Sequence, residues 1–320
     1  MVFLAAAAAH FGRNVQFDLD RIESIVAAAR RADVGLLVFP DGTLGGYLTD
    51  LRDPVLTELD GPGSGPRPLA ATGTTAEDAR ETSRSGPADA HAAEDGALPP
   101  AFAVDDPIFE RLAAVAGDMV ICLGYREAAV GAVSYNAAVC LSGAGVHGRH
   151  RKVHLAPGER LTYASGDRFT AFDSPVGRLG MLIDYDKTFP EAARALAADG
   201  ARIIACLSAW PASLTDPARR VVKDRQARLF DLYDCARAAE NQVVLVSANQ
   251  TGRLGALTFL GNAKIVGPGG DVRARTWAKA GLAVAEVDPD VEVALARRVL
   301  HHLDERRPSA YRVDRTDVPS

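Results

Sequence analysis

The stretch that decides the fold runs from Gly177 to Glu191 and reads GRLGMLIDYDKTFPE. Leu179 to Ile183 is an unbroken apolar run, typical of a buried strand. Thr188 to Glu191 predicts a capping box with proline in the first turn of a helix. Asp184 therefore lies between a strand and a helix, where several hydrolase folds expose a nucleophile beside backbone N–H groups. The alternative role, a helix-capping aspartate, suits Asp186 better than Asp184.

The same alternation of strand and helix extends along the chain in both directions. It opens with a predicted strand, a helix and a second strand, at Val2–Ala9, Phe17–Arg31 and Val34–Phe39. The alternation predicts an α/β fold of layered sheets and helices, with reactive groups on loops at strand ends. Further strands are expected at Met119–Leu123, Asn136–Leu141, Ile203–Leu207, Val243–Ser247, Ala263–Val266 and Leu282–Val287, and further helices at Pro190–Ala198 and Pro217–Glu240.

Composition excludes several classes of protein. Of the 320 residues, 48% are hydrophobic and 24% are charged, as in ordinary globular proteins. A net charge of -5 gives no general attraction for nucleic acid or anionic membrane surfaces. The apolar start, Val2–Ala9, is too short for a membrane span and has no basic flank. We expect a cytoplasmic protein whose partner is a small molecule.

One segment, Gly61–Pro100, breaks the alternation. It is rich in Gly, Pro, Ala, Ser, Thr and Asp, has almost no large apolar residue and shows no periodicity. Such a stretch cannot bury a core and is either a disordered insertion or a lid. We expect a disordered insertion within a single domain that spans residues 1–320. The charged tail, Arg306–Ser320, is expected on the surface or against a partner subunit.

The cysteines and the known motifs argue against metal or cofactor chemistry. Four cysteines lie far apart in apolar segments, without a CxxC pair, and are expected to be core residues. The chain has no GxxxxGK[ST], HExxH or GxSxG motif, and Gly267–Gly270 is typical of a hairpin turn. We therefore predict neither a cofactor nor a metal. The four cysteines are Cys122, Cys140, Cys206 and Cys235.

Two further segments carry groups suited to acid–base chemistry. Asp41 ends an apolar strand and is either a general base or a turn residue before Gly42. Lys152 lies in the basic run Arg149–Leu155, which is either a solvated face or, because apolar residues follow, drawn into the interior. A buried lysine needs a carboxylate to stay charged, and Glu159 is the nearest in sequence.

Several other motifs keep a recognisable order around these segments. Together with Asp41, Lys152 and Asp184, they resemble the nitrilase, or carbon–nitrogen hydrolase, superfamily over nearly the whole chain. They are Tyr135-Asn136, Leu207–Trp210, Arg237–Gln242, Ser247–Asn249, Phe259–Gly261, Pro268–Gly270, Val287–Pro289 and Arg306–Pro308 with Tyr311.

The resemblance implies an α-β-β-α sandwich that pairs through helices into a homodimer or larger assembly. The family uses a Glu, a Lys and a Cys on the C–N bonds of amides or nitriles. In this sequence those positions are Asp41, Lys152 and Asp184, and the family's second glutamate is Glu159. Supporting or substrate-binding residues are expected at Tyr47, Tyr185, Asn136 and Trp210.

Two substitutions in that set change the expected chemistry. Aspartate is one methylene shorter than glutamate, so the carboxylate of Asp41 lies further back than the family's base. Asp184 replaces a soft thiolate with a weak carboxylate nucleophile. We therefore expect a repurposed enzyme that uses acid–base chemistry for proton transfer, cyclisation, elimination or water-mediated hydrolysis. The alternatives are a pseudoenzyme that binds a ligand or partner, and residual amide hydrolysis. Richness in Ala, Arg and Gly suggests a bacterial source, and a family fold with changed chemistry suits a specialised metabolism.

Overall fold

The computed structural model describes residues 1–51, 98–131 and 133–311. The predicted insertion Gly61–Pro100 lies outside the described residues except for residues 98–100, and the tail lies outside from residue 312 onward. Among the described residues, every helix is too short or too polar to span a lipid bilayer.

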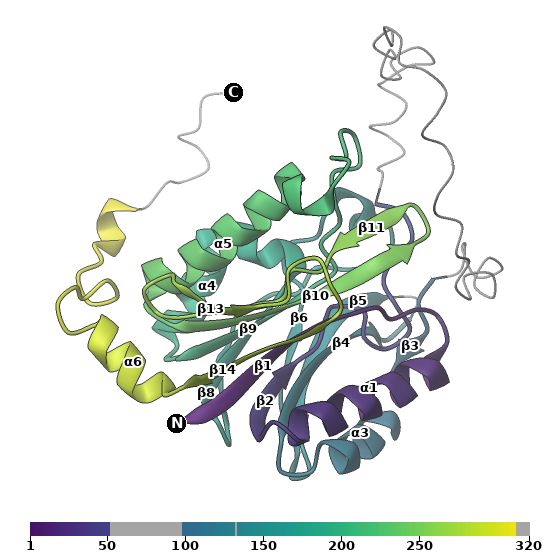
Figure 1. The fold of residues 1–320 in the computed structure, drawn as a ribbon, viewed down its shortest axis with the longest axis horizontal. Helices are drawn as coiled ribbons and strands as arrows, with labels where there is room; N and C mark the ends of the chain where they lie inside the picture. The colour runs from purple at the N-terminus through teal and green to yellow at the C-terminus, as the bar shows by residue number, and fades with distance from the viewer. Residues whose placement is uncertain (52–97, 132, 312–320) are drawn as a thin grey trace, which may run out of the picture.

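Strands and helices alternate along the described chain (Figure 1). The helices are α1 (Val15–Arg30), α3 (Ile108–Ala116), α4 (Pro190–Ala198), α5 (Arg225–Asn241) and α6 (Pro289–Ala296). The 3₁₀ turns are η1 (Pro157–Leu161), η2 (Asp184–Thr188), η3 (Val221–Lys223) and η4 (Pro308–Ala310). The strands are β1 (Val2–Ala9), β2 (Val34–Val38), β3 (Ala101–Phe102), β4 (Val120–Ala128), β5 (Ser134–Ser142), β6 (Gly145–Arg151), β7 (Phe172–Ser174), β8 (Gly177–Ile183), β9 (Ile203–Ser208), β10 (Val244–Leu254), β11 (Leu257–Leu260), β12 (Lys264–Val266), β13 (Val272–Arg275) and β14 (Gly281–Val287).

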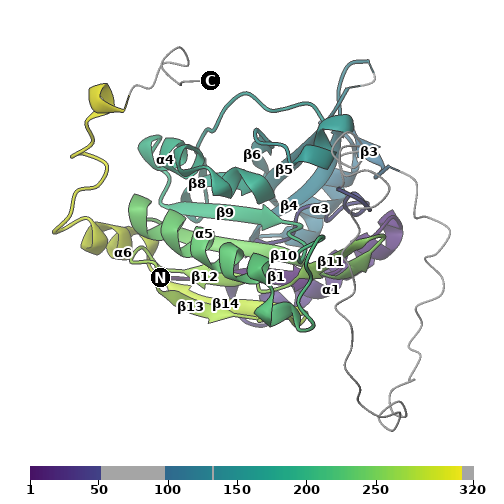
Figure 2. The same ribbon diagram turned by 90° about the horizontal axis from the view of Figure 1, so that it is seen from above.

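The core is built in layers of helix, sheet, sheet and helix (Figures 1 and 2). One apolar cluster packs α1 and α3 against β1, β2, β4 and β5. A second joins the facing sides of the two sheet halves, with Leu4 and Val38 on one half and Ile203 and Val246 on the other. A third packs α4 and α5 against β8, β9 and β10. The expected α-β-β-α sandwich of an α/β protein is therefore confirmed.

The sheet is continuous in the order β6-β5-β4-β2-β1-β10-β9-β8-β7. The six strands from β4 to β8 in this path run parallel to one another, whereas the outer pairs β4–β5, β5–β6 and β7–β8 are antiparallel. Where β1 meets β10, the register is short, with Ala8 opposite Asn249 and Ala9 opposite Gln250. Because parallel strands end at the same edge, residues that follow β2, β8 and β9 come together there.

The predicted strands and the helix Pro190–Ala198 are present. The bounds of that helix and of Val2–Ala9 are as predicted, and the other strands differ at one or both ends, most of all β10, which continues to Leu254. The helix predicted from Pro217 begins only at Arg225, where Asp224 caps it by accepting from the Gln226 backbone N–H. No strand was predicted in the basic run, yet Arg149 and Arg151 lie in β6, a strand at the edge of the sheet. The charged residues of β6 interrupt the apolar pattern by which a strand is recognised. Helices α3 and α6 were not predicted.

The capping box predicted at Thr188–Glu191 does not form. The Thr188 hydroxyl donates to the carbonyl of Tyr185, 2.9 Å away, and the residue that precedes α4 is Phe189, which has no capping side chain. The prediction was wrong because Asp184–Thr188 already form the 3₁₀ turn η2, which directs the threonine back into its own turn. Pro190 does occupy the first turn of α4.

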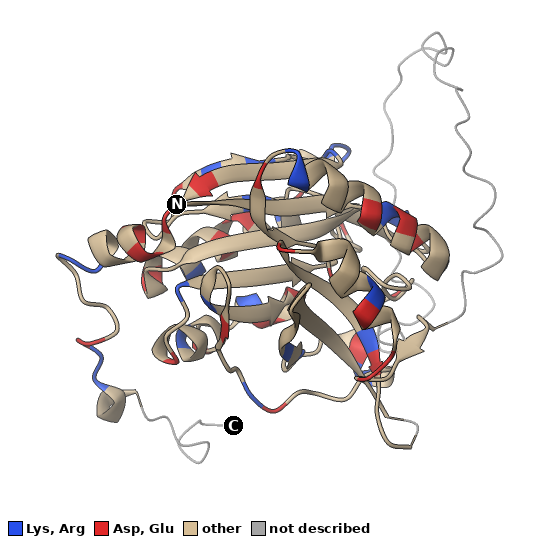
Figure 3. Cartoon of the chain, turned by 90° about the horizontal axis from the view of Figure 1, so that it is seen from below, with Lys and Arg blue, Asp and Glu red and all other residues tan. Residues whose placement is uncertain are grey.

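Charged residues of both signs are interspersed along the elements in the view of Figure 3. One buried carboxylate, Asp18 in α1, joins two loops by accepting from the backbone N–H groups of Gly12 and Gly45, at 3.1 and 2.9 Å. The Gly45 contact lies in the loop that follows β2. Helix α1 therefore supports the chain segment that begins at Asp41.

The backbone of Asp41 lies directly against β4, and Gly124 makes this approach possible. A Cβ atom on Gly124 would lie 2.8 Å from both the Asp41 Cα and the Gly42 nitrogen. The Gly124 N–H also donates to the Pro40 carbonyl, 3.3 Å away. No other residue type fits there without moving the loop that carries Asp41.

We predict that Gly124→Ala lowers the free energy of unfolding by about 1–3 kcal/mol, because the added methyl overpacks this contact. Urea denaturation measures the effect. Gly12→Ala is the matched control, since a Cβ atom there meets nothing within 4 Å. Equal stability of the two variants would show that the Asp41 loop tolerates displacement.

Candidate active site

The centre of the site is the side chain of Lys152, which follows β6 and is fully buried. Its Nζ lies 2.7 and 2.9 Å from the two carboxylate oxygens of Glu159 and 3.4 Å from Oδ2 of Asp184. Burial disfavours the charged lysine, but the charges of Glu159, Asp184 and Asp41 outweigh it and raise the pKa of Lys152. Lys152 is therefore a buried ammonium group.

Glu159, in η1, is the acceptor that holds this side of the site together. Besides the Lys152 Nζ, its Oε1 accepts from the Tyr47 hydroxyl at 2.7 Å and from the Asn136 amide at 3.1 Å. Its Oε2 accepts from the Ala156 backbone N–H at 2.7 Å. With every lone-pair direction engaged, Glu159 fixes the lysine rather than being free to react.

Asp41 follows β2, and its side chain is buried beside this network. Its Oδ2 accepts from the Asn136 amide at 2.9 Å, so Asn136 bridges Asp41 and Glu159. The Gln250 amide donates to the Asp41 carbonyl at 2.9 Å and holds the main chain. Burial raises the pKa of Asp41 to about 7, although Lys152 lowers it, and the charges of Asp184 and Glu159 add to the rise. Asp41 can therefore gain or lose a proton near neutral pH.

Asp184 begins η2 at the end of β8 with a backbone φ of 48°, in the left-handed region that non-glycine residues rarely adopt. This sharp turn directs its carboxylate to the shared sheet edge. Oδ2 faces Lys152, and Oδ1 accepts from the Ala209 backbone N–H at 3.2 Å, just beyond β9. Burial raises the pKa of Asp184 against the opposing effect of Lys152.

Asp186 takes part in capping the 3₁₀ helix η2, as the capping interpretation expected, because its Oδ2 accepts from the Ile183 backbone N–H at 3.2 Å. It is fully buried, and its oxygens lie 3.0 Å from both His150 Nε2 and His154 Nδ1. Oδ1 also accepts from the backbone N–H groups of Val153 and His154, at 3.2 and 2.8 Å. Asp186 thus ties η2 to the segment on both sides of Lys152, which fixes Asp184 and Lys152 relative to each other.

A pocket of about 580 Å³ opens onto Asp184, a size typical of small-molecule sites. Its lining is mostly apolar, with both aliphatic and aromatic side chains, and it also includes polar groups. The Trp210 indole N–H donates to the Gln226 side chain at 3.0 Å, which steadies one wall. The lining includes Tyr185, Phe189, Trp210 and Tyr233, and Thr215, Arg225 and Gln226.

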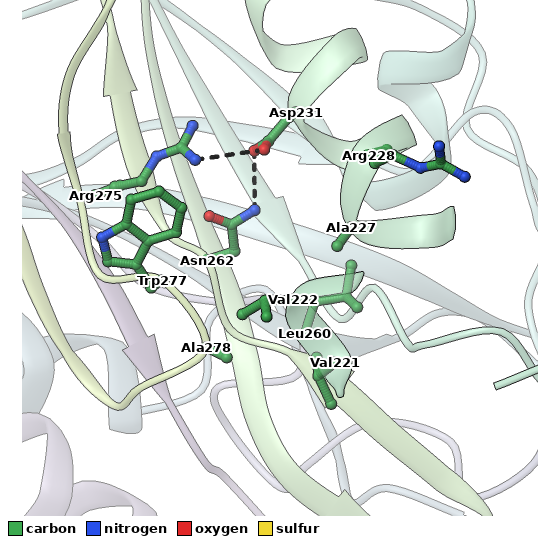
Figure 4. A pocket seen from close by; sticks show the side chains of 10 residues that line it. All are labelled: Val221, Val222, Ala227, Arg228, Asp231, Leu260, Asn262, Arg275, Trp277 and Ala278. Carbon is green, nitrogen blue, oxygen red and sulfur yellow. Dashed lines mark hydrogen bonds and ion pairs between the residues drawn. The ribbon is translucent and has the colours of Figure 1, made fainter. Parts of the chain in front are cut away.

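A second, smaller pocket lies between η3, α5 and the C-terminal ends of β11 and β13 (Figure 4). Its volume is about 60 Å³, and Asp231 there accepts from the Asn262 amide at 2.9 Å and pairs with Arg275 at 3.4 Å. None of the residues predicted for the site lines it.

The four cysteines are free thiols, three of them buried and Cys235 partly exposed. None lines the pocket that opens onto Asp184. Burial raises the pKa of Cys206 in β9 to about 12, so its thiol stays protonated at neutral pH. In the described part of the chain, no cluster of three or more His, Cys, Asp or Glu side chains could hold a metal ion.

Comparison with known proteins identifies the family of this fold. The family model for carbon–nitrogen hydrolases matches residues 5–297 of the chain. The chain belongs to this family. A probable nitrilase of Schizosaccharomyces pombe is 31% identical over 217 residues, which cover 66% of this chain and 75% of the nitrilase. An (R)-stereoselective amidase of a Pseudomonas species is 35% identical over 191 residues, which cover 59% of this chain and 65% of the amidase.

Solved structures of carbon–nitrogen hydrolases share the fold. A mutant of the Nesterenkonia AN1 amidase, from the nitrilase superfamily, is similar with a TM-score of 0.68 at 21% identity, over 97% of this chain and 95% of that chain. Another structure of an amidase from that source, similar with a TM-score of 0.67 at 20% identity over 97% of this chain and 95% of that chain, carries the acetamide moiety of fluoroacetamide at its active-site cysteine. At this identity the likeness shows the fold alone.

The structure brings most of the residues predicted for the site into one place. Lys152 contacts Glu159 and Asp184, and Asn136 joins Asp41 to Glu159. Tyr47 lies on the Glu159 side, whereas Tyr185 and Trp210 line the pocket on the Asp184 side. Sequence analysis missed how Asp186, two positions after Asp184, holds the Lys152 segment. Its charge in a segment between two apolar elements was the available signal.

The raised pKa of Asp41 predicts a dependence of stability on pH. Between about pH 4, the pKa of an unfolded aspartate, and pH 7, the folded state keeps a proton that the unfolded state has lost. The free energy of unfolding therefore falls as pH rises through this window, by at most about 1.4 kcal/mol per pH unit. Asp41→Asn removes this contribution, so the parent should lose stability relative to the variant between pH 5 and pH 8. Urea denaturation at both pH values measures it, and parallel curves would contradict the assignment.

Proposed function

We propose that this carbon–nitrogen hydrolase family member is a small-molecule enzyme in which Asp184 occupies the position of the family's cysteine nucleophile, so that acid–base chemistry replaces thiol chemistry. The observation that carries the proposal is the contact of 3.4 Å between the Asp184 carboxylate and the buried ammonium of Lys152. The pocket that opens onto Asp184 gives a small molecule access to that carboxylate. We take residues 1–320 to form one domain.

The arrangement suits two carboxyl groups with different protonation at neutral pH. Lys152 favours the ionised form of Asp184, whereas Asp41, with a pKa of about 7, is able to carry a proton. An ionised carboxylate and a protonated one near the same ammonium group can act as a general base and a general acid. The same pair serves proton transfer, cyclisation or elimination, and water-mediated hydrolysis.

Hydrolysis of a C–N bond is the first reaction to test, because the chain belongs to a family of C–N hydrolases. In this scheme, Asp184 removes a proton from water, and the resulting hydroxide adds to the substrate carbonyl carbon. Lys152 stabilises the negative oxygen that forms. Protonated Asp41 donates its proton to the leaving nitrogen as the C–N bond breaks, and the proton on Asp184 then restores Asp41. One water is consumed, and an acid and an amine are released.

A site that binds without turnover is the competing proposal, and one observation favours it. Both oxygens of the Asp184 carboxylate already have partners, the Ala209 N–H and the Lys152 Nζ. A carboxylate engaged in this way could serve only to shape a binding pocket. The competing proposals differ in whether turnover depends on the charge of Asp184.

We predict that Asp184→Asn lowers turnover at least about 100-fold, because the amide keeps the shape but cannot act as a base. Release of ammonia or amine from a panel of simple amides and nitriles measures it. Iodoacetamide should leave the parent's activity intact, because no cysteine lines the pocket. Turnover that is unchanged in Asp184→Asn, or abolished by the thiol reagent, would contradict the acid–base proposal. No turnover by the parent on a broader panel would support the binding site.

The proposal includes assembly into a homodimer or larger homo-oligomer. Exposed apolar side chains gather toward the C-terminal end of the described chain, where α6 and the segment after it carry several. Monomers seldom leave such a group in water. These residues are Val291, Leu295, Val299, Leu300 and Tyr311.

We predict that sedimentation at micromolar concentration shows at least a dimer, because assembly removes those side chains from water. Replacing Leu295 and Val299 by Asp should shift the distribution toward monomer, whereas Asp at exposed Val130, on the β4–β5 turn, should not. A monomeric parent would overturn this part of the proposal.

A further inference from the structure

A second group of buried charges lies behind Trp210, outside the catalytic set. Lys187 in η2, Asp234 in α5 and Lys264 in β12 are all fully buried. Asp234 accepts from the Lys187 Nζ at 2.8 Å through Oδ1 and from the Lys264 Nζ at 2.7 Å through Oδ2. Both ammonium groups also lie over the ring of Phe230, 3.2 and 3.9 Å from its centroid. Two buried cations thus share one fully buried anion.

The group carries an excess positive charge on the Lys187 side. Lys264 has a second carboxylate, Asp231, at 3.2 Å, and that residue is partly exposed and also faces Arg275. Among the described residues, Lys187 forms its ion pair with Asp234, 2.8 Å away. A buried ammonium that shares its anion with another cation favours any further negative charge nearby.

Asp184 is placed to be that negative charge. Asp184 and Lys187 are the first and fourth residues of the 3₁₀ turn η2, and side chains three apart in a 3₁₀ helix lie on the same side. The Lys187 Nζ is 5.1 Å from the ring centroid of Trp210, which lines the same pocket as Asp184. In agreement with this placement, the charge of Lys187 lowers the pKa of Asp184, against the larger effect of burial.

We propose that Lys187 is a positioning residue for the site, and that its ammonium, anchored by Asp234, supplies the second positive charge that keeps the Asp184 carboxylate ionised. This inference rests on the proposed function only in its effect on turnover. Lys152 cannot serve Asp184 alone, because its shortest contacts are with Glu159. Lys187 provides the second positive charge from within the same turn, η2.

Other groups also act on Asp184 and stay unchanged in the test. They are Lys152 and Glu159, which follow β6, Asp41 after β2, the Tyr47 hydroxyl, the Cys206 thiol in β9 and the Ala209 backbone N–H. Arg225 lines the same pocket. A purely structural role for Lys187, as the anchor of η2 on α5, is the alternative that the experiment must separate.

The test compares Lys187→Met with Lys264→Met in the full-length protein. Each variant removes one buried ammonium and leaves Asp234 paired with the other lysine. The two are therefore matched in charge and in the loss of the ion pair with Asp234, although Lys264→Met also removes the ion pair with Asp231. Only Lys187 shares a turn with Asp184. Lys187→Arg restores the charge and is the rescue variant.

The first readout is ¹³C NMR of protein labelled at aspartate carboxyl carbons, with the Asp184 signal assigned by its loss in Asp184→Asn. In Lys187→Met, the Asp184 titration should move to higher pH, while Lys264→Met and Lys187→Arg should stay close to the parent. Turnover at pH 6 relative to pH 9 should fall about tenfold in Lys187→Met alone, because less Asp184 is ionised at low pH.

The outcomes separate this inference from the proposed function. If the Asp184 titration is the same in Lys187→Met and Lys264→Met while both lose stability, Lys187 is only an anchor and the inference is overturned. If the titration moves in Lys187→Met as expected but turnover does not depend on Asp184, the inference holds and the acid–base proposal fails. Should either variant fold poorly, Lys187→Gln repeats the comparison with a side chain that can still donate to Asp234.

Discussion

The rest of the site depends on one constraint: the ammonium of Lys152 is buried and must be neutralised by carboxylates that the chain brings to it from distant positions. Glu159 meets it at 2.7 Å and Asp184 at 3.4 Å, and Asn136 links Asp41 to the same group. Removing one partner from a buried pair costs about 3–5 kcal/mol, since a charge is left without compensation. The elements that carry these residues are therefore held in register by the site as well as by the apolar core.

The same constraint explains why the carboxyl groups differ. Three of them around one lysine leave an excess of negative charge in a space with little water, and the group with the fewest direct donors takes up a proton most readily. Asp41, with a pKa of about 7, is that group, whereas Glu159 is held by four donors. The excess also gives a physical reason for a second cation. Lys187 is the fourth residue of the turn that begins at Asp184, and it shares Asp234 with Lys264.

Contacts from Asp186 stabilise the backbone turn that places Asp184 beside Lys152. The left-handed φ of 48° at Asp184 is an unfavourable conformation, of order 1 kcal/mol or more for a residue with a side chain. The contacts from Asp186 to His150 and His154 and to the backbone around Lys152 hold the turn in place. Strain at the reactive position is thus offset by a buried carboxylate two residues later.

The sequence by itself determined the layered α/β fold, because apolar runs of strand length alternate with amphipathic segments, and it marked Asp41, Lys152 and Asp184 as polar groups at the ends of such runs. These are local properties, readable from spacing and side-chain type. It could not determine that Arg149 and Arg151 belong to an edge strand, that Thr188 turns inward, or that Asp186 and Lys187 are buried. Those outcomes were decided by the tertiary structure. A charged residue becomes interior only when partners from remote segments, such as His150 for Asp186 and Asp234 for Lys187, replace its hydration, and no local pattern records which segments will meet.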